Sequence, residues 1–96
     1  MFAKSINRKR VNQLVKHDAL LVDMRSPVAY RNGSIDGAVN HPLKNFLNEL
    51  TGMNRKTKII VFGDTEEDPD VVTGINYGAQ LGFTMFVSSY KRLNAE

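Results

Sequence analysis

Cysteine is absent from this chain of 96 residues. Its absence excludes disulfide bonds, thiolate metal ligands and covalent chemistry that uses a protein thiol as the nucleophile. A chain without thiols is compatible with a reducing compartment, and we expect a cytoplasmic protein. Long apolar runs are absent as well, because no segment approaches the roughly 18 consecutive apolar residues of a membrane-spanning helix. We therefore expect no membrane partner.

The length and composition are typical of one globular domain. Hydrophobic residues make up 42% of the chain, which is enough to bury a core, and charged residues make up 24%. No internal repeat or low-complexity segment divides the sequence. We expect residues 1–96 to form a single domain.

Acidic residues are few outside one short stretch, VFGDTEEDPDVV, at residues 61–72. This stretch holds five of the ten acidic residues, and the other five face 13 lysines and arginines, so the remainder of the chain carries a charge of +8. A basic surface can attract nucleic acid. No aromatic residues alternate with these charges to stack on bases, which disfavours nucleic acid as the partner. We keep a nucleic-acid-binding basic face only as an alternative.

The apolar pattern predicts strands that alternate with helices. Short apolar runs predict strands at residues 19–24, 38–40, 58–62 and 84–87, and helical spacing predicts helices at 8–17, 27–31, 43–50 and 69–81. Asn7 is expected to cap the first helix, and Asp68, followed by Pro69, is expected to cap the last one. Alternation of this kind in a short chain predicts an α/β fold with a small, mostly parallel sheet flanked by helices.

The segment LVDMRSPVAYRNGSIDGAVNHP, residues 21–42, resembles the first signature of the rhodanese homology domain. The matching positions, which the resemblance identifies as the structural motif, are Asp23, Arg25, Tyr30, Gly33, Ile35, Gly37, Ala38 and Pro42. Two positions depart from the family pattern, since Ser34 stands in place of a histidine and Ala29 in place of a glutamate. Without that glutamate, Arg25 must find its hydrogen-bond partners elsewhere. The resemblance extends over essentially the whole chain.

The resemblance also implies where a catalytic residue would lie. Enzymes of this family take a sulfane sulfur from thiosulfate, or a similar donor, onto a cysteine directly after the strand that corresponds to residues 58–62. The loop after that cysteine surrounds the sulfur with backbone N–H groups. Here the cysteine position is Gly63, and the degenerate active-site loop comprises Gly63, Asp64, Thr65, Glu66, Glu67, Asp68 and Pro69. We expect no catalytic residue, no enzymatic activity, no cofactor and no bound metal.

Three interpretations of the acidic loop follow. The first is a non-catalytic binding or regulatory module, in which the concentrated negative charge of the loop meets a basic protein partner. The second is an accessory domain in sulfur transfer that docks a persulfide-bearing partner. The third is a solvated turn that binds nothing. Members of the family that lack the cysteine are typically interaction modules, so the resemblance favours the first interpretation.

Overall fold

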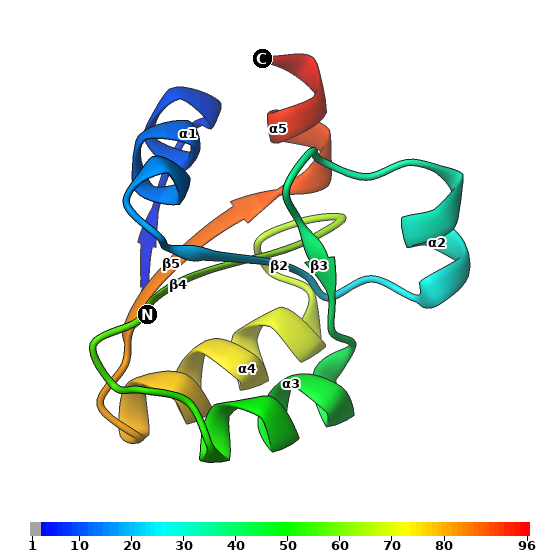
Figure 1. Ribbon diagram of the computed structural model, residues 1–96. Helices are drawn as coiled ribbons and strands as arrows, with labels where there is room; N and C mark the ends of the chain where they lie inside the picture. The colour runs from blue at the N-terminus through cyan, green and yellow to red at the C-terminus, as the bar shows by residue number, and fades with distance from the viewer. Residues whose placement is uncertain (1–2) are drawn as a thin grey trace.

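The computed structural model describes residues 3–96 and contains one five-stranded sheet with helices on both faces (Figure 1). The elements along the chain are β1 (Ala3–Ser5), α1 (Arg8–Lys16), β2 (Leu20–Asp23), α2 (Pro27–Asn32), β3 (Val39–Asn40), α3 (Leu43–Thr51), β4 (Lys58–Gly63), α4 (Pro69–Gln80), β5 (Thr84–Ser89) and α5 (Tyr90–Ala95). The strand order is β1-β5-β4-β2-β3, and every described strand pair is parallel. The predicted α/β class, with a sheet flanked by helices, is confirmed.

Side chains from the two faces of the sheet form two apolar layers. Helices α3 and α4 cover one face and α1 and α5 cover the other (Figure 1). Because successive strand residues point to opposite faces, Val61 packs against α3 and α4 while Ile60 and Phe62 pack against α1 and α5. A strand with both faces covered is apolar throughout, which explains the continuous run at β4.

The helix boundaries follow local capping signals. Asn7 caps α1 as predicted, since its side-chain oxygen accepts a hydrogen bond of 3.0 Å from the backbone N–H of Arg10. Ser26 caps α2 in the same way, through the N–H of Ala29. The chain leaves α4 through Gly82, whose φ of +95° lies in the left-handed region that glycine adopts without strain.

Two elements, β1 and α5, were not predicted. Strand β1 adds to the sheet beside β5, with Ala3 opposite Met85 and Ser5 opposite Val87. It is a three-residue edge strand with no alternation of apolar side chains, so its sequence carries no strand signal. Helix α5 has one buried residue, Leu93, and follows β5 directly, so no apolar stripe or breaker marks it.

The sheet brings the residues after β2 and β4 together. These two strands are neighbours, with Asp23 opposite Phe62, and both run in the same direction. Residues that follow them therefore meet at the carboxyl ends of the strands, where ligand sites of open parallel sheets usually form.

Candidate functional site

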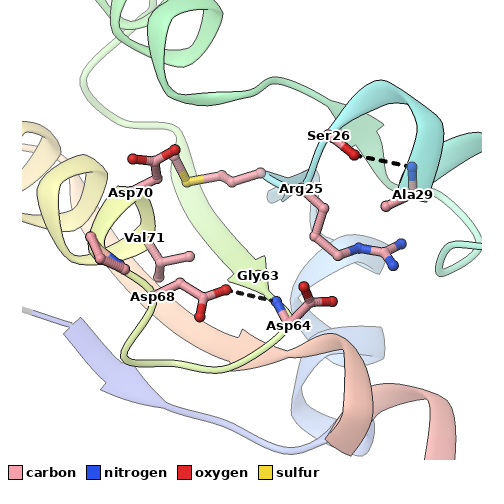
Figure 2. Close-up of a pocket in the computed structure, with 10 residues that line it drawn as sticks. Arg25, Ser26, Ala29, Gly63, Asp64, Asp68, Asp70 and Val71 are labelled. Atoms are coloured by element: carbon pink, nitrogen blue, oxygen red, sulfur yellow. Dashed lines mark hydrogen bonds between the residues drawn. The ribbon is translucent and has the colours of Figure 1, made fainter.

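A cavity of about 420 Å³ lies at the carboxyl ends of β2 and β4 (Figure 2). Its walls come from the end of β2, the start of α2, the end of β4 and the start of α4, and the lining residues are Met24, Arg25, Ser26, Ala29, Gly63, Asp64, Asp68, Pro69, Asp70 and Val71. The cavity thus joins part of the predicted motif to part of the predicted degenerate loop. Glu66 and Glu67 belong to the same loop but do not line the cavity.

Asp23 and Arg25 anchor one wall of the cavity. The Asp23 side chain is completely buried, and its Oδ2 lies 2.8 Å from Nη2 of Arg25. The same Nη2 donates to the carbonyl oxygen of Gly33 at 2.6 Å, and the guanidinium lies 3.8 Å from the ring centroid of Tyr90. The hydrogen bond with Asp23 raises the pKa of Arg25 above its usual value, and the Asp64 carboxylate adds to this shift. Arg25 therefore replaces the missing glutamate partner with contacts inside the chain.

The other motif positions hold the segment between α2 and α3. Ser34, which stands where the family has a histidine, donates to Oδ2 of Asp23 at 2.7 Å. The Tyr30 hydroxyl donates to the carbonyl oxygen of Ala38 at 2.9 Å. Gly33 and Gly37 have φ angles of +151° and +86°, which bulkier residues resist. Ile35 and Ala38 are buried, and Pro42 occupies the position before α3. These contacts give the motif a structural role in the fold.

Asp68 does not cap α4 as predicted. It occupies the N-cap position, but its carboxylate makes no hydrogen bond to the helix. The side chain turns back instead, and it accepts from the backbone N–H of Asp64 at 3.0 Å (Figure 2). It also accepts from the backbone N–H of Thr65 at 3.4 Å and from the Thr65 hydroxyl at 2.8 Å. The prediction was wrong because the N–H groups of the tight loop compete for the same acceptor.

The carboxylate of Asp68 also fills the space beside Gly63. A Cβ atom built on Gly63 would lie 2.7 Å from Oδ2 of Asp68 and 2.7 Å from Cγ2 of Val71. Real side chains do not approach so closely, so a residue with a Cβ would require one of these neighbours to move. The Asp68 carboxylate thus accepts hydrogen bonds from the loop N–H groups beside Gly63, the position where the resemblance places a cysteine nucleophile.

The five carboxylates of the acidic stretch have different surroundings, which the sequence does not distinguish. Glu66 accepts from the Ser5 hydroxyl at 2.6 Å and lies 3.8 Å from Nη1 of Arg92, so it joins the loop to β1 and α5. Four of these side chains form no ion pair in the described structure. Asp68 is half-buried and hydrogen-bonded to the loop, whereas Asp64, Glu67 and Asp70 are exposed. Available negative charge is therefore concentrated on these three residues.

Tyr90 is a site residue that the sequence analysis missed. Its ring covers the Arg25 guanidinium and its hydroxyl lies near Gly33, because α5 follows β5 at the same edge of the sheet as the motif. No local signal marks it, since the contact depends on the unpredicted α5.

His17 and His41 are not among the cavity residues. Within residues 3–96, no group of three histidine or acidic side chains is arranged to hold a metal ion.

Comparison with known proteins identifies the family. The model of the rhodanese-like domain matches residues 7–92. Among solved structures, a rhodanese-related protein from Thermoplasma volcanium superimposes with a TM-score of 0.72 at 21% identity, covering 91% of this chain and 84% of its own. The rhodanese-like domain of an Anabaena protein has a TM-score of 0.72 at 16% identity and covers 99% of this chain and 74% of its own.

A longer relative shows the same fold within a larger chain. The reduced CoADR-RHD protein of Bacillus anthracis gives a TM-score of 0.75 at 17% identity over 93% of this chain, which spans only 16% of that protein. Identities this low establish the fold alone. No curated protein matches the sequence, and none of the helices within residues 3–96 is long and apolar enough to cross a membrane. The family match over residues 7–92 shows that this chain belongs to the rhodanese-like domain family, although its sequence contains no cysteine.

Proposed function

We propose that this chain is a non-catalytic rhodanese-like binding module that docks a basic protein segment at the loop between β4 and α4. The observation that supports it most directly is the cavity of about 420 Å³, because exposed carboxylates of Asp64 and Asp70 line it beside Met24 and Val71. The only cation among the lining residues is Arg25, and its charge is already offset by Asp23. The cavity therefore presents unpaired negative charge beside an apolar wall.

A lysine or arginine side chain matches this combination. Its methylene stem can pack on apolar atoms while its charged end reaches a carboxylate. Electrostatic complementarity of this kind raises the rate of encounter and selects a basic partner over an acidic one. Exposed ion pairs are individually weak, so the docking should be reversible and sensitive to salt.

The residues of the loop supply no substitute for the missing thiol. The Thr65 hydroxyl donates to Asp68 and accepts from the N–H of Glu67, so it is engaged within the loop. No histidine lines the cavity to activate a hydroxyl nucleophile. The purified chain should accordingly show no transfer of sulfur from thiosulfate to cyanide, and turnover at rates typical of the family would overturn the non-catalytic assignment.

The docking proposal is tested with a fluorescent tetralysine peptide. Its affinity for the wild type is compared, by fluorescence anisotropy at low salt, with that of the double variant Asp64→Asn/Asp70→Asn. The matched control is Asp36→Asn/Glu49→Gln, which removes the same charge at two exposed positions outside the cavity. We expect the cavity variant to lose most of the binding and the control to retain it. Equal losses in both variants would show that net charge alone governs binding, and the proposal would fail.

A further inference from the structure

Two clusters of charged side chains, opposite in sign, lie at the two ends of β4. The acidic loop follows the carboxyl end of the strand, at Gly63. Lys58 is the first residue of the same strand and Lys56 precedes it, and the last turn of α1 brings Lys16 to that end (Figure 1). We call the surface formed by Arg10, Lys16, His17, Lys56 and Lys58 the basic end.

Two adjoining hollows shape the basic end. The first, of about 350 Å³, is lined by Arg10, Gln13, Leu14, Lys16, His17 and Lys58, and none of these residues is acidic. The second, of about 260 Å³, shares His17 and Lys58 with the first and adds one carboxylate, that of Asp18. No cation of the basic end forms an ion pair within residues 3–96. The basic end is therefore a hollowed surface with unpaired positive charge.

The fold explains why these residues meet. Arg10 and Leu14 lie one turn apart on one face of α1, and Leu14 is buried against the sheet. His17 is the residue that ends this helix, so it lies at the same end of β4 as Lys58. Lys58 points to the same face of the sheet as Ile60, which packs beneath α1. The end of α1 and the start of β4 thus hold their cations side by side.

The two ends match in charge but cannot meet within one molecule. At the acidic end, four carboxylates form no ion pair in the described structure, those of Asp64, Glu67, Asp68 and Asp70. At the basic end, four lysine and arginine residues lie beside one carboxylate, that of Asp18, so the two ends carry unpaired charge of opposite sign. Six residues of β4 separate the ends by about 20 Å at the usual rise per residue. This distance exceeds the Debye length of about 8 Å at physiological ionic strength, so each end acts independently.

We propose that the basic end of one copy binds the acidic loop of a second copy, in a head-to-tail arrangement. This inference rests on the proposed function, since it names a second copy of the chain as a basic partner for the acidic loop. The absence of aromatic side chains from both hollows favours carboxylates over nucleic-acid bases as the occupant. Because this contact joins two different surfaces, the first copy of an assembly still has one surface free and the last copy has the other. Association therefore continues into open filaments or closes into rings.

The test is a mixing experiment by sedimentation velocity. The basic-end variant removes the lysine charges of the basic end and keeps the acidic loop; it is Lys16→Gln/Lys56→Gln/Lys58→Gln. The acidic-loop variant removes the exposed carboxylates of the loop and keeps the basic end; it is Asp64→Asn/Glu67→Gln/Asp70→Asn. All six positions are exposed, so both variants should fold, which circular dichroism checks. At about 20 mM salt we expect the wild type to form oligomers that dissociate at about 0.5 M salt, where charges are strongly screened. Each variant alone should be monomeric, and an equimolar mixture should form dimers and nothing larger.

Three outcomes would overturn the inference: a monomeric wild type at low salt, variants that associate as the wild type does, or a mixture that stays monomeric. A different result would assign the basic end to nucleic acid: the wild type stays monomeric and is retained on immobilised RNA, and the basic-end variant is not retained. The proposed function has its own readout, because the basic-end variant retains Asp64 and Asp70. If that variant binds tetralysine while the wild type does not self-associate at low salt, the inference fails and the docking proposal stands.

Discussion

A cysteine placed at position 63 is expected to destabilise the fold. A Cβ atom there would lie 2.7 Å from Oδ2 of Asp68 and 2.7 Å from Cγ2 of Val71, so at least one neighbour must shift. The carboxylate can move only by giving up the hydrogen bonds it accepts from Asp64 and Thr65. Overpacking of this kind typically costs about 1–3 kcal/mol, and we expect Gly63→Cys to lower the free energy of unfolding by that amount.

The thiol of this variant should also ionise less readily than an ordinary cysteine. At about 5 Å and an effective dielectric constant near 20, one carboxylate opposes a thiolate by about 3 kcal/mol. Asp68 is half-buried and its loop is partly solvated, so we reduce this to about 1–2 kcal/mol. The N-terminus of α4 favours the thiolate by only about 0.3–1 kcal/mol. The balance opposes the thiolate by about 0.5–1 kcal/mol. Because 1.36 kcal/mol corresponds to one pKa unit, the thiol pKa should rise by about half a unit above its usual value near 8.5.

The pH dependence of iodoacetamide alkylation measures this pKa directly. Gly63→Cys is compared with Gly63→Cys/Asp68→Ala, which removes the close contact with Asp68 and its charge but keeps the contact with Val71. Gly63→Cys/Glu67→Ala is the control for net charge. We expect the Asp68 substitution to lower the thiol pKa by about one unit and the Glu67 substitution to change it much less. The single variant should not transfer sulfur from thiosulfate to cyanide. A thiol pKa below 8.5 in the single variant, together with turnover, would refute this electrostatic reasoning.

Four further substitutions can be tested by urea denaturation. Asp68→Ala should cost about 1–2 kcal/mol, because it removes three hydrogen bonds to the loop, whereas Glu67→Ala should change stability by less than about 0.5 kcal/mol; equal losses would contradict the assigned role of Asp68. Ser88→Ala should leave stability unchanged or raise it by about 0.5–1 kcal/mol, since the buried hydroxyl has no partner within residues 3–96, and a loss above about 1 kcal/mol would reveal one. Gly78→Ala should cost about 1–3 kcal/mol, because its Cβ would lie 2.6 Å from the sulfur of Met85, and a neutral result would show that this methionine repacks freely.

The sequence predicted the larger elements well because their signals are local. The apolar runs of β2 and β4 and the cap of α1 by Asn7 depend on neighbours in the chain, and each appears as expected. The resemblance also implied that Arg25, without the glutamate at position 29, must find other partners, and it bonds Asp23 and Gly33. These features required no knowledge of distant contacts.

The parts that the sequence did not predict depend on contacts between distant segments. Strand β1 exists only because β5 offers an unpaired edge, and Glu66 is held by Ser5 and Arg92, which lie far from it in the chain. Because Glu66 has these two partners, its removal should lower the stability of the fold. The prediction for the Asp68 side chain was wrong for a different reason. Its carboxylate can reach the N–H groups of the first turn of α4 or those of the loop before it, and the capping rule considers only the helix.

The pairing of β1 with β5 has a consequence for how the chain acquires its structure. Residue 3 lies opposite residue 85, and the backbone N–H of Ile6 bonds the carbonyl oxygen of Val87, so the first strand finds its place only after almost the entire chain has been synthesised. Contacts between such distant segments slow folding, because the entropy of closing the intervening chain is lost before the contact forms. During translation, the edge of β5 that β1 covers does not yet exist. We therefore expect the domain to complete its sheet in a late step, after β5 has formed, with β1 as the last strand to join.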